Sequence, residues 1–469
     1  MTDKQQAGGA MSPAQIVDAF ARLGWKNNDP MGQVLRLRRD DPQALGELVT
    51  RFLDLGHEHA TFIDAALDLM DDATYADTLR QAWQRSRQGE TSKALAEVLD
   101  SAAVQWPEVF ADDWDRLLRA AHQGQGGPRF GVDFAWRALD AETARNWLAQ
   151  VGPEAEEGSL EHLRARAVLH SRQPALVLDV WRRVFAAPDD PNGIYWLMAV
   201  GYADDNGQAR ALHGERPLHI GFSAAQRKLM EASQPAWRRE IHRLHPTWGV
   251  AGCRVDPVRT GRPATSAEPG AAGIDAQADA ATITQGRMGG ALTATCGLCH
   301  GPLHRLLALP QPALAGIACD TPLELATCLS CQGWERDASV LFFRHDDQGA
   351  PQAHPSQQRA EPWTPEFPAE PLLEADVTLF QAPARWAWQD WGDSNSRQNL
   401  SRVGGPPSWV QQGEYPPCPD CGKHMDYAMQ LDSDLPQEGG GEWLWGSGGC
   451  NYTFWCAHCR VSGHLWQCT

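Results

Sequence analysis

The sequence predicts an α+β protein, in which an N-terminal α-helical solenoid or bundle is followed by a pseudo-duplicated antiparallel β domain. Three observations predict this class. Apolar residues recur at helical spacing up to about residue 245. Short strand-like segments separated by Pro and Gly turns follow residue 293, and all twelve cysteines lie at or after position 253.

Residues 12–250 are predicted to form the α-helical, solenoid-like domain. In "QALGELVTRFLDLG", the apolar residues Leu45, Leu48 and Phe52 follow one another at steps of three and four, and Gly56 ends the segment. Breaks such as "GETS" and "GQGGP" separate further segments of this kind. Because no fixed period repeats, the pattern indicates an irregular solenoid or a bundle and none of the named repeat folds.

A flexible linker is predicted at residues 251–292, followed by the β domain at 293–469. The linker is rich in Gly, Ala, Pro, Ser and Thr and holds almost no large apolar residue, so it cannot bury enough surface to order itself. Beyond it, "SVLFFRHDD", "HMDYAMQLD" and "NYTFWC" are strand-like. In "RWAWQDWGD", Trp386 and Trp388 are expected to share one face of a strand, as core residues or as anchors for a partner.

Eight cysteines form two quartets, each built from two CxxC pairs. The quartets are Cys296, Cys299, Cys328 and Cys331, and Cys418, Cys421, Cys456 and Cys459. Four thiolates in two such pairs suit a tetrahedral zinc ion, so the sequence predicts two zinc knuckle sites with two structural Zn²⁺ ions. The segments "CGLCHGPLHRLLALP" and "CPDCGKHMDYAMQLDSDLP" resemble each other, which predicts an internal duplication.

Two other interpretations of the cysteines stay open. A redox pair requires a single CxxC that opens a helix, whereas each CxxC here leads into a strand-like segment. A catalytic zinc ion requires an open coordination position, and four cysteines leave none. The sequence does not decide whether His458 replaces a cysteine ligand, or whether the remaining cysteines bind metal; these are Cys253, Cys319, Cys450 and Cys468.

Charge and composition exclude several classes of function. The formal net charge of −18 would be repelled by a phosphate backbone, so nucleic acid is not expected as a partner. The sequence has neither a membrane span nor a recognisable secretory signal, which predicts a cytoplasmic protein that does not bind membranes. Because no nucleophile, phosphate-loop or metalloprotease motif occurs, the protein is not expected to be an enzyme.

The stretch "RVGGPPSWVQQGEYPPCPDCGKHMDYAMQLD" resembles the bacterial YwqG-like family through Gly404, Gly405, Pro407, Trp409 and Gln430. "WLWGSGGCNYTFWCAHC" is similar to the closing glycine turn, aromatic strand and cysteine knuckle of that family. The duplicated knuckles also resemble, more distantly, the programmed cell death protein 2 family. The likeness covers roughly residues 375–469 and, loosely, 290–345, and it implies a pseudo-duplicated β domain.

The resemblance implies a function in protein binding. YwqG-like domains are associated with immunity proteins, so the chain is expected to be a cytoplasmic protein-binding protein that neutralises a bacterial toxin or effector. The acidic charge suits a basic toxin or effector as the partner. Two alternatives stay open: a chaperone or assembly factor for a basic client protein, and a zinc-dependent enzyme with an unrecognised site.

Overall fold

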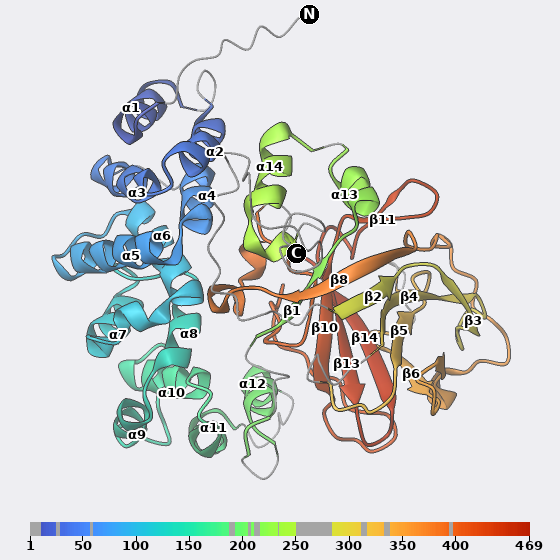
Figure 1. Ribbon diagram of the computed structural model, residues 1–469. Helices are drawn as coiled ribbons and strands as arrows, with labels where there is room; N and C mark the ends of the chain where they lie inside the picture. Colours follow the sequence, from blue (N-terminus) through green and yellow to red (C-terminus); the bar gives the residue numbers. More distant parts are fainter. Residues whose placement is uncertain are drawn as a thin grey trace, which may run out of the picture. The chain divides into compact units, whose positions relative to one another are not determined.

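The chain folds into two compact units, which are drawn in Figure 1. The computed structural model describes residues 11–24, 29–56, 60–186, 193–204, 208–210, 216–232, 234–249, 284–310, 317–332, 338–393 and 397–469. Of these, the residues up to Ser171 form unit 1 and those from Arg172 onward form unit 2. The predicted linker lies mostly outside the described residues; the structure describes it only from residue 284, where a strand begins.

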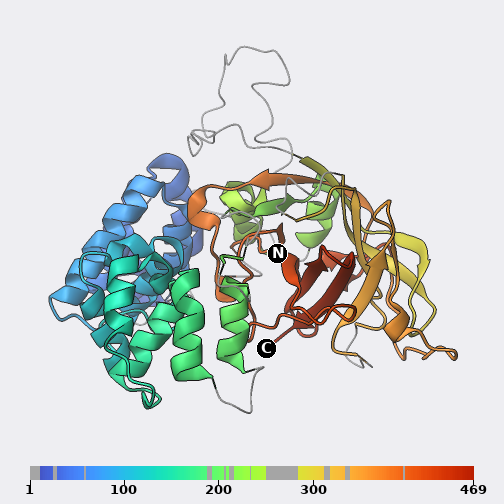
Figure 2. The same cartoon turned by 90° about the horizontal axis from the view of Figure 1, so that it is seen from below.

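Unit 1 is α-helical, as the apolar spacing predicted. Its helices are α1 (Pro13–Leu23), α2 (Pro30–Asp40), α3 (Ala44–Asp54), α4 (Thr61–Leu69), α5 (Asp72–Arg87), α6 (Lys93–Gln105), α7 (Trp114–Gln123), α8 (Val132–Ala135), α9 (Ala141–Leu148) and α10 (Leu160–His170). Figures 1 and 2 show them stacked side by side in chain order. The helices pack against partners one to three steps away along the chain, so the core of unit 1 is built from local contacts.

Helix α1 shows how the sequence sets these elements. The Ser12 hydroxyl caps the first turn while the Gln15 side chain caps the Ser12 backbone, and Pro13 follows at the first helical position.

Within the unit, the ring of Phe62 lies 4.9 Å from the Phe20 ring and 5.5 Å from the Phe52 ring, centroid to centroid. The edge-to-face arrangement of these rings is favourable, so three helices share one aromatic cluster.

Unit 2 combines four helices with an antiparallel sheet. Its helices are α11 (Pro174–Val180), α12 (Ile194–Tyr202), α13 (Ala224–Met230) and α14 (Ala236–Leu244). Its strands are β1 (Leu218–Gly221), β2 (Thr284–Met288), β3 (Ala291–Thr295), β4 (Pro302–Leu309), β5 (Leu323–Thr327), β6 (Leu341–His345), β7 (Pro351–Ala353), β8 (Ala375–Gln381), β9 (Arg402–Val403), β10 (Asp426–Asp432), β11 (Leu435–Pro436), β12 (Glu442–Trp443), β13 (Cys450–Cys456) and β14 (Val461–Gln467).

Twelve of these strands form one sheet, in the order β3-β4-β2-β8-β1-β9-β10-β13-β14-β6-β7, with β5 paired to β4. Strand β1 comes from a segment that the sequence pattern placed in the helical half, because "LHIG" is too short to show a strand period. It pairs with β8 and β9 and lies in the middle of the sheet. The edge strands β3 and β7 contact each other, so the sheet curls back on itself.

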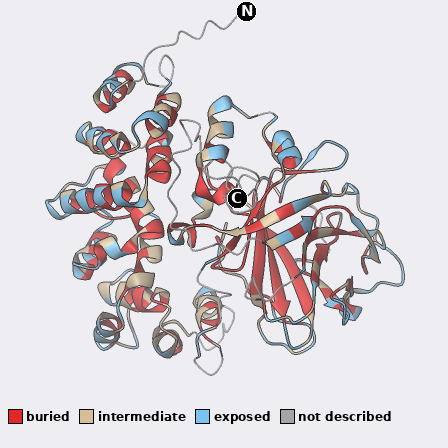
Figure 3. Cartoon of the chain, viewed as in Figure 1, coloured by how far each residue is buried: buried red, intermediate tan, exposed pale blue. Residues whose placement is uncertain are grey.

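The central strands are buried on both faces. Figure 3 shows β10, β13 and β14 in the buried colour along almost their whole length. In β13, alternate residues such as Tyr452 and Phe454 belong to one apolar cluster, and Trp455 belongs to another on the opposite face. The two CxxC pairs of the C-terminal quartet therefore lie at the end of the best-packed part of the sheet.

The strand expected around Trp386 does not form. Residues 384–386 make a short 3₁₀ turn, in which Trp386 is 2% exposed, and a second turn covers Trp391–Asp393. Trp388 packs beneath the Arg172 guanidinium, whose carbon lies 4.7 Å from the ring centroid. Pro383 is the N-cap of the first turn, and its missing N–H and fixed φ angle disfavour a strand there, so the alternation of the tryptophans was misleading.

Within the described residues, no helix is both long and apolar enough to cross a bilayer.

Candidate metal centres

The first cysteine quartet forms a compact cluster. The four sulfur atoms of Cys296, Cys299, Cys328 and Cys331 lie within 4.8 Å of one another. The Sγ atoms of Cys296 and Cys331 are 3.7 Å apart, and those of Cys299 and Cys328 are 3.5 Å apart. The sequence prediction that these residues meet is confirmed.

The second quartet is equally compact. Cys418, Cys421, Cys456 and Cys459 also lie within 4.8 Å of one another, and the Sγ atoms of Cys421 and Cys456 are 3.8 Å apart. Cys418 and Cys456 are buried, while Cys421 and Cys459 are partly exposed. One side of this cluster therefore faces the surface.

The backbone of both leading knuckles follows one hydrogen-bond pattern. In the first, the Cys296 N–H donates to Gly301 O at 2.8 Å and the His300 N–H donates to Cys296 O at 3.0 Å. In the second, the Cys418 N–H donates to Lys423 O and the Gly422 N–H donates to Cys418 O, both at 2.8 Å.

This tight turn puts the residue after the second cysteine in the left-handed region. The φ angle is +59° at His300 and +72° at Gly422, and Arg460 has +55° after Cys459. The turn also frees backbone N–H groups for sulfur. Gly301 N lies 3.4 Å from Cys299 Sγ and Leu298 N lies 3.4 Å from Cys296 Sγ. Hydrogen bonds from the Cys296 side chain and other neighbouring thiols lower the pKa of Cys299, which favours its thiolate.

Strand register repeats between the two clusters. In each half, the residue eight positions after the first cysteine pairs with the residue just before the third cysteine. These pairs are His304 with Thr327 and Asp426 with Trp455. A register shift follows at the same offset in each half, between Arg305 and Leu307 and between Tyr427 and Met429.

The geometry of both clusters fits zinc. Four sulfur atoms placed tetrahedrally about 2.3 Å from a zinc ion lie roughly 3.8 Å from one another. The separations of 3.5, 3.7 and 3.8 Å match this edge length. When bound, such an ion cross-links the two knuckles of a cluster, and the eight cysteines are the residues that would hold it.

The other candidate ligands lie outside the clusters. His458 is exposed and belongs to neither group. Cys450 is buried with its thiol 3.7 Å from Asp432 Oδ1, and Cys319 lies near Thr321. Cys468 is partly buried, whereas Cys253 is outside the described residues.

The Gly-Gly-Pro-Pro-Ser-Trp segment wraps a buried guanidinium. Arg402 is fully buried; it donates to Gln389 Oε1 at 2.8 Å, to Ser408 Oγ at 2.7 Å and to the Pro406 carbonyl. Burial lowers the pKa of this arginine. The sequence pattern indicated this segment but not its buried arginine; the available signal was "RV" directly before the Gly-Gly turn.

The remaining motif residues complete this network. Gly404 and Gly405 have φ angles of +68° and +69°, and a Cβ on Gly405 would lie 2.8 Å from a Pro217 carbon, so the turn requires glycine. The Gln430 side chain accepts from the Ser408 N–H at 2.9 Å. Trp409 lies 4.5 Å from the Tyr452 ring, centroid to centroid. The motif is therefore structural in unit 2.

Replacing Arg402 with Met is expected to destabilise unit 2 by about 3–5 kcal/mol. The substitution leaves the Gln389, Pro406 and Ser408 oxygens buried without their donor. Arg287→Met, at an arginine whose side chain is 56% exposed, should change the unfolding free energy by less than about 0.5 kcal/mol. Urea unfolding followed by tryptophan fluorescence compares the two, and equal small losses would contradict the structural role.

His242 and His245, three residues apart at the end of α14, are buried. The His242 ring stacks on Trp248 at 3.7 Å, and His242 Nδ1 lies 3.3 Å from Glu231 Oε1. His245 Nδ1 lies 2.8 Å from Thr247 Oγ1. Within the described chain, neither belongs to a group that could hold a metal ion. The aromatic side chains of Trp248 and Trp386 cover the two rings, and His245 Nδ1 also accepts the Thr247 N–H as the cap of the next turn.

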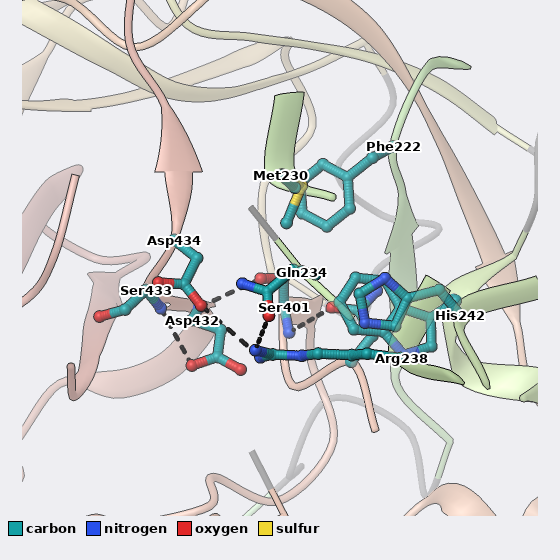
Figure 4. Close-up of a pocket in the computed structure, with 11 residues that line it drawn as sticks. Phe222, Met230, Gln234, Arg238, His242, Ser401, Asp432, Ser433 and Asp434 are labelled. Carbon is teal, nitrogen blue, oxygen red and sulfur yellow. Dashed lines mark hydrogen bonds and ion pairs between the residues drawn. The ribbon is translucent and has the colours of Figure 1, made fainter. Parts of the chain in front are cut away.

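A small hollow lies beside His242, between α13, α14 and the β10–β11 turn (Figure 4). Arg238 enters it and lies 3.8 Å from Asp434 Oδ2, and burial raises the pKa of Asp434. The hollow measures about 20 Å³, which is the space of roughly one water molecule. An organic substrate does not fit there.

A larger, open groove of about 450 Å³ lies beside β2, β4 and β5. Its volume is within the range of small-molecule sites, roughly 300–1,000 Å³. Its polar lining includes Arg287, Glu324 and Asp376, and Glu324 is already paired with Arg305 at 2.7 Å. The described lining offers no histidine, cysteine or serine, and its carboxylates, on Glu324 and Asp376, are the groups there that could act as a base.

No protein-family model and no solved structure matches the chain. The chain is similar to the uncharacterized protein YpfL of Salmonella typhimurium, with 36% identity over 187 residues. This match covers 37% of the chain and 39% of YpfL, so it spans well under half of that relative.

Proposed function

We propose that each cysteine cluster holds one structural zinc ion and that the two halves of the sheet are duplicates. The sulfur separations support the zinc assignment, because they equal the edges of a tetrahedral four-thiolate site. The repeated knuckle pattern, strand register and register shift support the duplication. Four sulfur ligands complete the coordination of each ion, which then stabilises the fold and leaves no position for a substrate.

We further propose that the protein acts by binding another protein. The observation that carries this proposal is the presence of four clustered cysteines at each candidate centre. Four thiolates would saturate a zinc ion, which assigns the proposed metal to structure and leaves function to the surface. The one-water hollow beside His242 offers no room for catalysis on an organic substrate. A cytoplasmic location, without membrane or nucleic acid as a partner, is part of this proposal.

The surface of unit 2 suits a basic partner. Between residues 346 and 376, seven residues are acidic and one is basic. Glu361, Glu366 and Glu370 are exposed in this stretch, and Phe367 between them is 76% exposed. Negative charge around an exposed aromatic side chain favours fast association with a cationic surface that has an apolar pocket.

The specific role we propose is that of an immunity protein, in line with the resemblance to the YwqG-like family. It would bind a basic toxin or effector that acts in the cytoplasm and cover its active surface. A chaperone or assembly factor for a basic client would use the same acidic surface. A zinc-dependent enzyme would require one of the cysteine centres to lose a ligand.

Co-expression tests the immunity role. The gene adjacent to that of this protein is expressed under an inducible promoter, with and without the chain. Restored growth and co-purification of the two proteins are expected if the neighbour is its toxin. Protection without co-purification would contradict a binding mechanism, and binding to a harmless basic protein would favour the chaperone alternative.

Charge variants test the surface. Replacing Glu361, Glu366 and Glu370 with Gln should slow association with the co-purified partner about tenfold at low salt, because steering falls with local charge. The matched control replaces Glu154, Glu156 and Glu157, three exposed acids of unit 1, with Gln. Surface plasmon resonance at two salt concentrations measures both, and equal effects would place the contact elsewhere.

A further inference from the structure

A single segment of unit 2, residues 341–363, contacts both cysteine centres. At the first centre, the Arg359 N–H donates to Gly297 O at 2.9 Å and the Trp363 N–H donates to Leu298 O at 2.8 Å. Gly297 and Leu298 are the two residues between the ligands Cys296 and Cys299. The Trp363 side chain also packs on the apolar cluster that contains the first quartet.

The same segment holds the second centre through Asp420. This aspartate lies between the ligands Cys418 and Cys421. Its two carboxylate oxygens accept from Arg344 Nη2 at 2.8 and 2.7 Å, and His354 Nε2 lies 3.2 Å from Oδ1. Arg344 belongs to β6, and His354 follows β7.

The segment is held together between these two contacts. Arg344 faces Gln352 in the β6–β7 pair. The His354 N–H donates to Phe342 O at 3.2 Å. The Gln357 side chain accepts from the Phe342 N–H at 2.8 Å and donates to Val340 O at 2.7 Å. The segment is therefore tied together by hydrogen bonds between its contacts with the two centres.

We infer that the two centres are energetically coupled, so that metal at the second centre slows metal loss from the first. This inference rests on the proposed zinc sites. An empty second centre frees its knuckle, which releases Asp420 from Arg344 and His354 and loosens residues 341–363. The carbonyls of Gly297 and Leu298 then lose their fixed donors. Asp420 is a positioning residue in this arrangement. Its carboxylate binds residues of the 341–363 segment, and it belongs to neither cysteine quartet.

A double-mutant cycle tests the coupling. Cys456→Ser with Cys459→Ser empties the second centre, and transfer of the remaining zinc to 4-(2-pyridylazo)resorcinol is timed by stopped-flow absorbance. Loss from the first centre should be about 5- to 150-fold faster than in the wild type, the span of typical coupling between sites. Asp420→Asn should speed it in the two-zinc protein and leave it unchanged in the emptied background.

Asp346→Asn is the matched control for this cycle. The Asp346 carboxylate accepts the backbone N–H groups of Gln348 and Ala350 in the β6–β7 turn. Arg460, next to the ligand Cys459, donates to the Asp346 backbone carbonyl, which the substitution leaves in place. It should alter neither rate. A merely destabilising effect of Asp420→Asn would appear equally in both backgrounds and would overturn the coupling.

A second measurement avoids the cysteine variants, in case they do not fold. Native mass spectrometry of apoprotein given one equivalent of zinc should show mainly zero- and two-zinc species for the wild type. Asp420→Asn should populate the one-zinc species. Statistical loading of both proteins would overturn the coupling while leaving two zinc sites intact, whereas absence of any bound zinc would refute the proposed sites themselves.

Discussion

Removal of metal is expected to unfold unit 2 and to leave unit 1 folded. Each structural zinc site contributes about 10–16 kcal/mol to the folding of a small zinc-binding peptide, more than a typical domain's whole stability. The first cluster joins β4 to β5, and the second joins β10 to β13 and β14. Loss of both ions would therefore remove the cross-link from each half of the sheet. Unit 1 has none of the clustered cysteines and keeps its own aromatic core.

Circular dichroism with a strong chelator measures this effect. The helical signal at 222 nm should remain mostly intact, while the near-ultraviolet signal of the buried tryptophans of unit 2 should collapse. Added zinc should restore it, and magnesium should not, because thiolates prefer the softer ion. An unchanged near-ultraviolet spectrum after complete metal removal would show that the clusters do not hold the fold.

Acid is expected to destabilise unit 2 well before its carboxylates are protonated. Burial lowers the pKa of His219, His242 and His464 to about 3, and that of His345 to about 4. The unfolded chain binds these protons near pH 6.5, so the stability is complete above pH 6.5. It is lost progressively as the pH falls from 6.5 toward the folded-state pKa values. At pH 5 each histidine with a pKa of about 3 costs about 2 kcal/mol.

Urea unfolding at pH 7.5 and pH 5, with zinc content checked in each sample, measures this loss. In the native fold, His464 Nδ1 lies 3.0 Å from Thr453 Oγ1 in β13. Replacing His464 with Asn should shrink the difference between the two pH values by about 2 kcal/mol. His458→Asn removes an exposed imidazole of the same unit and should leave the difference unchanged. An identical pH dependence in His464→Asn and wild type would assign the acid sensitivity to other groups.

The sequence predicted the two cysteine clusters better than the sheet around them. Two CxxC pairs at matched spacing imply a four-sulfur site, because few other arrangements use that pattern. The eight cysteines therefore met as expected. By contrast, the segment containing β1 carries only four residues, too few to show alternation, and its place between β8 and β9 depends on pairing far along the chain.

The role of the Gly-Gly-Pro-Pro segment also required the structure. Its glycines and prolines predicted a turn, but the turn's purpose is set by Arg402, which would ordinarily be assigned to the surface. The burial of His242 and His245 depends on the same kind of contact, since polar side chains are buried only where tertiary partners satisfy them. Sequence periodicity carries no information on such partners.

The metal content of purified protein tests the account's central claim most directly. Inductively coupled plasma mass spectrometry on protein produced without added metal should give two zinc ions per chain. Cys296→Ser with Cys299→Ser should give one, and so should Cys418→Ser with Cys421→Ser, because each pair belongs to a separate cluster. Wild-type protein that is folded and contains no zinc, or zinc that persists after all four substitutions, would contradict it.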